Sequence, residues 1–143
     1  MTALEHITGA DRLVERFGGW PSFHDAEVVR LTLDRRGDGG PTAEMLVHAW
    51  RMTDNVDERG YYVLEKHTLV RFLFERITSN ELSAFNHQNV LFHLDITRET
   101  VDGLPQFRVS LDPSFGLGGS LVCRRVVVAD VTPCDERGEP AAK

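Results

Sequence analysis

The sequence predicts an α+β fold that is mostly β: a curved antiparallel sheet of about six strands with one N-terminal helix packed on it. Apolar and polar residues alternate with period two along most of the chain, which is typical of half-buried strands. Most links between these runs are short and contain glycine, proline or aspartate, which favours antiparallel neighbours. One stretch with helical spacing precedes the first strand.

The helix is expected over residues 8–17. Thr8 is the predicted N-terminal cap, with Asp11 three positions further on. The apolar stripe that would face the sheet consists of Leu13, Val14 and Phe17. Gly18 and Gly19 end the helix, because glycine adopts the left-handed conformation of a C-terminal cap without steric cost.

A glycine-proline corner leads from this helix into the sheet. Pro21 fixes its own φ and pushes Trp20 towards extended geometry. We therefore expect Trp20 to fill the gap between helix and sheet, with Phe23 as a second large aromatic anchor.

Six strands are expected, at residues 26–35, 42–52, 61–77, 90–97, 107–112 and 120–131. The buried face of the first would carry Val29, Leu31 and Leu33, and one face of the fourth carries Val90, Phe92, Leu94 and Ile96. The third is long for a single strand, and Lys66-His67-Thr68 interrupts its apolar run, which indicates a bulge or bend. The last is apolar on both faces, which indicates a central position.

The chain of 143 residues is expected to form a single globular domain over residues 1–133, followed by a polar flexible tail at 134–143. A chain of this size can bury a core without disulfides. The spacing of Cys123 and Cys134 fits no zinc motif, and Cys123 lies in an apolar strand. The first residues lack the basic start and apolar stretch of a signal peptide, so we expect a cytoplasmic protein. No apolar run reaches the roughly 18 residues of a membrane span, so no membrane partner is expected.

The formal charge of −6 argues against nucleic acid as a partner, because such binding depends on a basic surface that neutralises phosphates. It is compatible with a basic protein partner, since complementary charge steers encounter and fixes register. Solubility alone also accounts for a charge of this size.

The densest polar group is His24, Asp25 and Glu27. In a strand Asp25 and Glu27 would point to one face and His24 to the other, so a metal site would need a further histidine from another strand. The available strand histidines are His48, His67 and His93. We favour a structural function in which Asp25 accepts hydrogen bonds from backbone N–H groups of the corner. No catalytic residue, metal site or cofactor is therefore predicted.

Two other functions stay open at this point. One is a small metal-dependent hydrolytic enzyme that uses His24, Asp25 and Glu27 with a strand histidine. The other is a self-associating structural domain with an exposed sheet edge.

Residues 19–27, Gly-Trp-Pro-Ser-Phe-His-Asp-Ala-Glu, resemble the signature of the immunity protein 50 family of bacterial polymorphic toxin systems. Weaker similarity lies in residues 66–70, 85–90 and 115–119, the last leading to Cys123. The resemblance covers about 17–133. The motif residues to which we assign a structural function are Trp20, Pro21, Phe23, His24, Asp25, Asn86 and Asn89.

This resemblance implies a cytoplasmic, non-enzymatic protein that binds a cognate toxin domain and neutralises it. It brings no catalytic or metal residues with it, and it does not predict an oligomeric state. A basic toxin, such as a nuclease, would suit the acidic surface. The expected partner-binding residues are Asp25 and Glu27, together with Asp54, Asp57 and Glu58 of a charged loop at residues 53–60.

Overall fold

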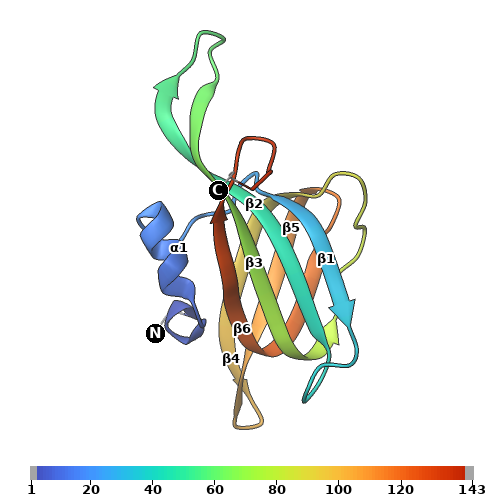
Figure 1. Cartoon of the computed structure of the whole chain (residues 1–143). Coiled ribbons are helices and arrows are strands. Elements are labelled where there is room, and N and C mark those ends of the chain that lie inside the picture. Colours follow the sequence, from blue (N-terminus) through green and yellow to red (C-terminus); the bar gives the residue numbers. More distant parts are fainter. Residues whose placement is uncertain (1–2, 141–143) are drawn as a thin grey trace.

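The computed structural model describes residues 3–140 and shows six antiparallel strands closed into a barrel (Figure 1). The strands are β1 (Glu27–Asp34), β2 (Thr42–Val56), β3 (Tyr62–Asn80), β4 (Val90–Val101), β5 (Leu104–Phe115) and β6 (Gly119–Pro133). A short 3-10 helix, η1 (Ala3–His6), and one α-helix, α1 (Ala10–Phe17), precede them. Around the barrel the order is β1-β2-β3-β6-β5-β4. The predicted fold class is confirmed.

The barrel interior is filled by the apolar residues that alternate along β2, β3 and β5. The largest of these are fully buried: Phe72, Phe74, Met45, Val47, Val70 and Val109. The period-two interpretation of the second and fifth strands is confirmed, because these strands keep their alternation where they cross the core. β6 lies between β3 and β5, as its apolar faces indicate.

A bulge in β1 changes which residues face the core. Val28 pairs with Val47 and Arg30 with Leu46, so Val29 is the extra residue. Val28 is buried, Val29 and Leu33 are exposed, and Leu31 is half-buried against the core. The prediction that Val29, Leu31 and Leu33 share a buried face was therefore wrong for Val29, which the bulge turns outward, and for Leu33, which lies near the end of the strand.

Register shifts on both sides of Leu91 have the same effect in β4. Leu91 and Leu94 are buried, whereas Phe92 is 44% exposed. The predicted face with Phe92 and Leu94 on one side was wrong, because irregular pairing here separates residues that strict alternation would place together.

The predicted bulge at residues 66–68 is confirmed. Ala49 pairs with Thr68 and Arg51 with Glu65, so two residues of β3 lie opposite Trp50. Beyond this point β2 and β3 continue as a two-stranded hairpin that stands away from the barrel (Figure 1). We call residues 51–65 the arm. The loop expected at residues 53–60 is shorter, because β2 extends to Val56 and β3 begins at Tyr62.

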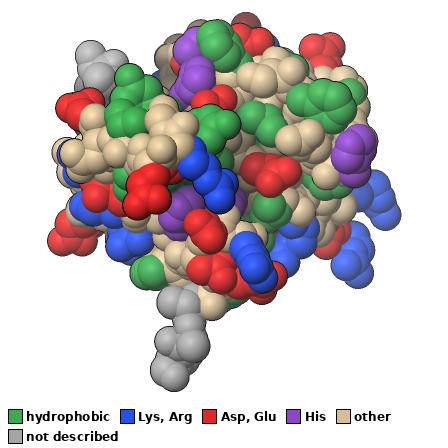
Figure 2. All heavy atoms as spheres, turned by 90° about the horizontal axis from the view of Figure 1, so that it is seen from above, with side chains coloured by type: hydrophobic (Ala, Val, Ile, Leu, Met, Phe, Trp, Pro, Cys, Tyr) green, Lys and Arg blue, Asp and Glu red, His purple; other side chains and the backbone are tan. Residues whose placement is uncertain are grey.

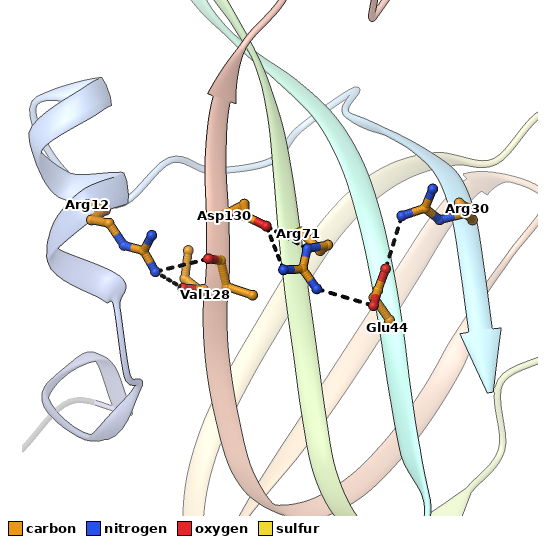
Figure 3. A network of polar contacts seen from close by, with 7 residues as sticks. Arg12, Arg30, Glu44, Arg71, Val128 and Asp130 are labelled. Atoms are coloured by element: carbon orange, nitrogen blue, oxygen red, sulfur yellow. Dashed lines mark hydrogen bonds and ion pairs between the residues drawn. The ribbon is translucent and has the colours of Figure 1, made fainter. Parts of the chain in front are cut away.

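The N-terminal segment covers an open edge of the sheet. β5 pairs with β6 only over residues 119–123 of β6. Further along β6, Thr8 donates its N–H to the Val126 carbonyl (3.1 Å) and accepts from the Val128 N–H (2.7 Å). Arg12 of α1 donates to the carbonyl of Val128 (Figure 3). An uncovered strand edge is a template for pairing with another chain, so this cover is a protective feature.

The start of α1 differs from the prediction. The residue preceding the helix is Gly9, with φ of 82° and no side-chain cap, while Thr8 pairs with β6. A Cβ atom on residue 9 would lie 2.4 Å from the Val128 carbonyl oxygen, which explains glycine at this position. The C-terminal cap is as predicted: Gly18 is left-handed and donates its N–H to the Val14 carbonyl. Leu13 and Phe17 reach the core, whereas Val14 is exposed.

A row of ion pairs crosses the outer surface of four strands (Figure 3). Glu44 of β2 accepts from Arg30 of β1 at 3.0 Å and from Arg71 of β3 at 3.2 Å. Arg71 also contacts Asp130 of β6 at 2.6 Å. The side chains of Arg30 and Asp130 are more than half exposed and those of Glu44 and Arg71 about one-third exposed, so solvent screens each pair and its contribution to stability is small. In the part of the chain that the structure describes, no helix is long and apolar enough to cross a membrane.

Candidate functional site at the barrel junction and the arm

Three of the sequence motifs meet where β1 and β4 close the barrel. The two strands share a single residue pair, Glu27 with Val90. Backbone bonds on either side complete the junction. The N–H groups of Asp25, Val28 and Leu91 donate to the carbonyls of Leu91, Asn89 and Ala26, at 2.8–2.9 Å. The closure therefore depends on residues immediately before and inside the two strands.

Asn89 is the centre of this junction and is 3% exposed. Its Oδ1 accepts the N–H groups of Asn86 and Leu117, both at 3.0 Å. Its Nδ2 donates to the carbonyls of Asn86 (2.9 Å) and Val28 (3.4 Å). A Cβ atom on Gly116, whose φ is 81°, would lie 2.2 Å from the Gln88 carbonyl oxygen, so this turn requires glycine. One amide thus ties β1, the loop before β4 and the loop after β5 together.

The corner at residues 20–25 is anchored on the core by aromatic packing. The ring of Trp20 lies 5.9 Å from that of Phe23 and 6.3 Å from that of Phe72, and Phe23 lies 5.7 Å from Phe72. Phe23 is buried and Trp20 is half-buried. Trp20 packs against the edge of the core beside the helix, in the place that its position between helix and sheet predicts.

The polar residues of the corner lie in a turn and not in a strand. Phe23 and Asp25 both have positive φ, 59° and 65°, so strand alternation does not apply to them. His24 Nδ1 lies 3.2 Å from Asp25 Oδ2, and both side chains are nearly half exposed. The acceptor function expected of Asp25 stays a prediction. Among the described hydrogen bonds of the corner, Ser22 Oγ accepts the His24 N–H at 3.2 Å.

Histidine and aromatic rings gather around this junction. The ring of Phe92 lies 5.2 Å from that of His24 and 4.4 Å from that of His93, and His87 lies 5.7 Å from Phe115. Within residues 3–140 no three His, Cys, Asp or Glu side chains are placed to hold a metal ion together. The hypothesis of a metal-dependent enzyme therefore finds no ligand set among these residues.

Two hollows flank the corner. One, of about 300 Å³, lies between residues 17–22 and Trp50, Arg51 and Met52 at the root of the arm. The other, of about 460 Å³, lies between Trp20, η1 and residues 93–96 of β4. The corner is thus a ridge beside the arm. Figure 2 views the molecule from this end and shows acidic side chains interspersed with hydrophobic ones and histidines.

A histidine pair lies at the bulge where the arm leaves the barrel. His48 is buried, and its Nε2 is 3.0 Å from Nδ1 of His67. Residues 134–140 form a hydrogen-bonded turn beside this pair: Cys134 donates its N–H to the His67 carbonyl (3.0 Å), and Gly138 packs near His48. This segment was expected to be part of a flexible tail. Its flexibility stays a prediction, and residues 141–143 lie outside the described chain.

The His48 environment predicts a dependence of stability on pH. Burial lowers the pKa of His48, as does the neighbouring His67, while Asp135 acts in the opposite direction. The unfolded chain therefore takes up the proton at a higher pH than the folded protein. We expect the free energy of unfolding to fall as the pH drops below about 6.5, the ordinary histidine pKa.

Urea unfolding at several pH values between about 5 and 8 measures this dependence. His48→Gln should flatten the profile below neutral pH, whereas His93→Gln, at an exposed position, should leave it unchanged. A His48→Gln profile as steep as that of the wild type would contradict the prediction.

The five predicted partner-binding residues fall into two groups. Asp25 and Glu27 lie at the junction, whereas Asp54, Asp57 and Glu58 lie on the arm. Asp57 also has a structural function, since its Oδ1 accepts the N–H groups of Arg59 (2.9 Å) and Tyr61 (3.0 Å). That either group of residues binds a partner stays a prediction.

The structure adds apolar residues that the sequence interpretation missed. The arm exposes Met52, Val56, Tyr61, Tyr62, Val63 and Leu64. They were missed because the tip was interpreted as a charged loop and the rest as buried strand. The two adjacent tyrosines beside the glycine-containing turn are the signal that could have indicated an exposed hairpin.

The chain matches the model of a known protein family. The family model described as Immunity protein 50 matches residues 9–134, nearly the whole chain. Comparisons with curated proteins and with solved structures gave no match. The resemblance carried by the corner and the junction loops is thereby confirmed, and the chain belongs to the immunity protein 50 family.

Proposed function

We propose that the protein neutralises a cognate toxin of a bacterial polymorphic toxin system by binding the toxin domain and occluding its active site. The family match over residues 9–134 is the observation that carries this proposal, since membership implies an immunity function. In this proposal the protein acts in the cytoplasm and performs no reaction itself. A closed barrel whose junction is hydrogen-bonded through Asn89 suits such a function, because a preorganised surface loses little conformational entropy on binding.

The proposed partner is basic. The protein has a formal charge of −6, and complementary charge accelerates encounter and excludes partners of like charge. Asp25 and Glu27 at the junction and Asp54, Asp57 and Glu58 on the arm would face it. The hollow between the corner and the arm root supports a single continuous interface, because residues 17–22 and Trp50, Arg51 and Met52 line it together.

Co-expression with the toxin domain encoded by the adjacent reading frame tests this proposal. Cells that make the toxin domain alone should stop growing, and cells that also make this protein should grow normally. In vitro, the purified protein should inhibit the toxin at a one-to-one ratio. Growth arrest in the presence of abundant, folded immunity protein would contradict the proposal.

A further inference from the structure

We infer that the arm is the docking element, and that it inserts into the basic active-site cleft of the toxin. This inference rests on the proposed function and adds the binding element and the chemistry of its receptor. The arm is the one part of β2 and β3 that carries large apolar side chains without a covering layer in the described structure. It projects beyond the barrel, so a cleft can accept it without a clash with the barrel (Figure 1).

The exposed apolar residues of the arm are too concentrated to be incidental. Tyr61 is 68% exposed and Tyr62 is 58% exposed, and Met52 and Val56 lie on the opposite strand. Soluble domains tolerate scattered exposed apolar residues, but contiguous groups mark interaction sites. Tyrosine is enriched among the residues that dominate binding energy, because it buries a large area with few rotatable bonds and keeps a polar tip.

Hydrogen bonds within the arm order its turn and its two strands. Asp57 closes its turn through the Arg59 and Tyr61 N–H groups, and the Asp57 N–H donates to the Tyr61 carbonyl (2.8 Å). Thr53 Oγ1 donates to the Val63 carbonyl at 2.7 Å. Met52 pairs with Leu64 and Val56 with Tyr62, so residues 53–55 form a bulge that includes Asp54. Such ordering lowers the entropic cost of docking.

The charge of the arm identifies its receptor as basic. Residues 51–65 contain four acidic and two basic side chains, a formal charge of −2. Two of the acidic residues, Asp54 and Glu58, lie at or near the tip. Among the described residues of the arm, the ion pair is that of Arg51 with Glu65 at the root, at 3.7 Å. A second copy of the chain would bring like charges together, −2 on each arm and −6 on each molecule. A cleft with basic residues and apolar walls matches both features.

Calorimetry tests this inference by measuring the affinity of the protein for an inactivated form of the toxin domain that the adjacent reading frame encodes. Tyr61→Ser combined with Tyr62→Ser should weaken binding about 30-fold or more, the loss typical of a dominant interface residue. Asp54→Asn combined with Glu58→Gln should weaken binding at low salt and reduce the dependence of the affinity on salt. Replacement of residues 53–63 by Asn-Gly, which joins the paired residues Met52 and Leu64 by a two-residue turn, should abolish inhibition.

The matched control is the hairpin between β4 and β5 at the other end of the barrel (Figure 1). Val101 and Leu104 are exposed there to a similar degree as the arm residues, and Val101→Ser combined with Leu104→Ser should leave binding unchanged. Circular dichroism and thermal unfolding establish that every variant is folded.

The outcomes separate the inference from the function on which it rests. Binding by the wild type with no loss in the tyrosine variant would overturn the docking inference and leave the proposed function intact. A wild-type protein that neither binds nor inhibits the toxin would overturn both. A wild-type dimer that the tyrosine variant converts to a monomer would overturn the inference in favour of self-association through the arm.

Discussion

Phe72→Ala is expected to lower the free energy of unfolding by about 3–5 kcal/mol, the range for aromatic truncation in a closed core. Phe72 is fully buried, and its ring lies 5.8 Å from Phe74, 5.7 Å from Phe23 and 6.3 Å from Trp20. It therefore joins the barrel interior to the corner that precedes β1. Strands hydrogen-bonded on both sides cannot move inward to fill the cavity that the truncation leaves.

Urea denaturation followed by far-ultraviolet circular dichroism measures this loss. Phe92→Ala is the matched control, because it removes the same atoms from a ring that is 44% exposed. It should cost less than about 1 kcal/mol, as surface changes usually do. Equal losses in the two variants would contradict the placement of Phe72 at the centre of the core.

Asn89→Ala is expected to cost about 2–4 kcal/mol, because it leaves buried backbone groups without hydrogen-bond partners. The Leu117 N–H loses its acceptor and the Val28 carbonyl loses a donor. Both groups lie where the loops meet the β1–β4 junction, so the loss should also loosen the closure of the barrel. Backbone amides of residues 25–28 and 90–92 should then exchange faster with solvent.

Asn86→Ala is the matched control for Asn89→Ala. Asn86 is exposed, and its side chain bonds only to neighbours within two residues, the Ala84 carbonyl and the Gln88 N–H, among the described contacts. We expect a loss below about 1 kcal/mol and unchanged exchange at the junction. If Asn89→Ala lowered the free energy of unfolding as little as Asn86→Ala, the central function assigned to Asn89 in the closure would be wrong.

The strands that the sequence predicted well are those whose pairing is regular. β5 alternates across the core and β2 does so up to Val47, so Met45, Val47 and Val109 were placed correctly. The end of α1 was also predictable, because Gly18 provides a local signal. In β1 and β4 the bulges next to Val28 and Leu91 changed the faces. A bulge depends on pairing with a distant strand, which local periodicity does not contain.

The candidate site was predictable only in its separate parts. The motifs containing Trp20, Asn86 and Asn89 were recognised, but their meeting at one junction depends on the closure of β1 onto β4. Thr8 was interpreted as a helix cap from its type, whereas the open edge of β6 recruits it as a pairing residue. The arm was missed because alternation does not distinguish a strand that crosses the core from one that continues beyond it.

Hydrogen–deuterium exchange of the protein, alone and bound to the inactivated toxin domain, tests the central claim most directly. We expect the complex to slow exchange in the arm at residues 52–64 and in the corner at 20–25, and to leave the opposite hairpin at 99–106 unchanged. Slower exchange confined to residues 99–106, or to the outer surface that carries the Glu44–Arg71–Asp130 ion pairs, would contradict docking through the arm.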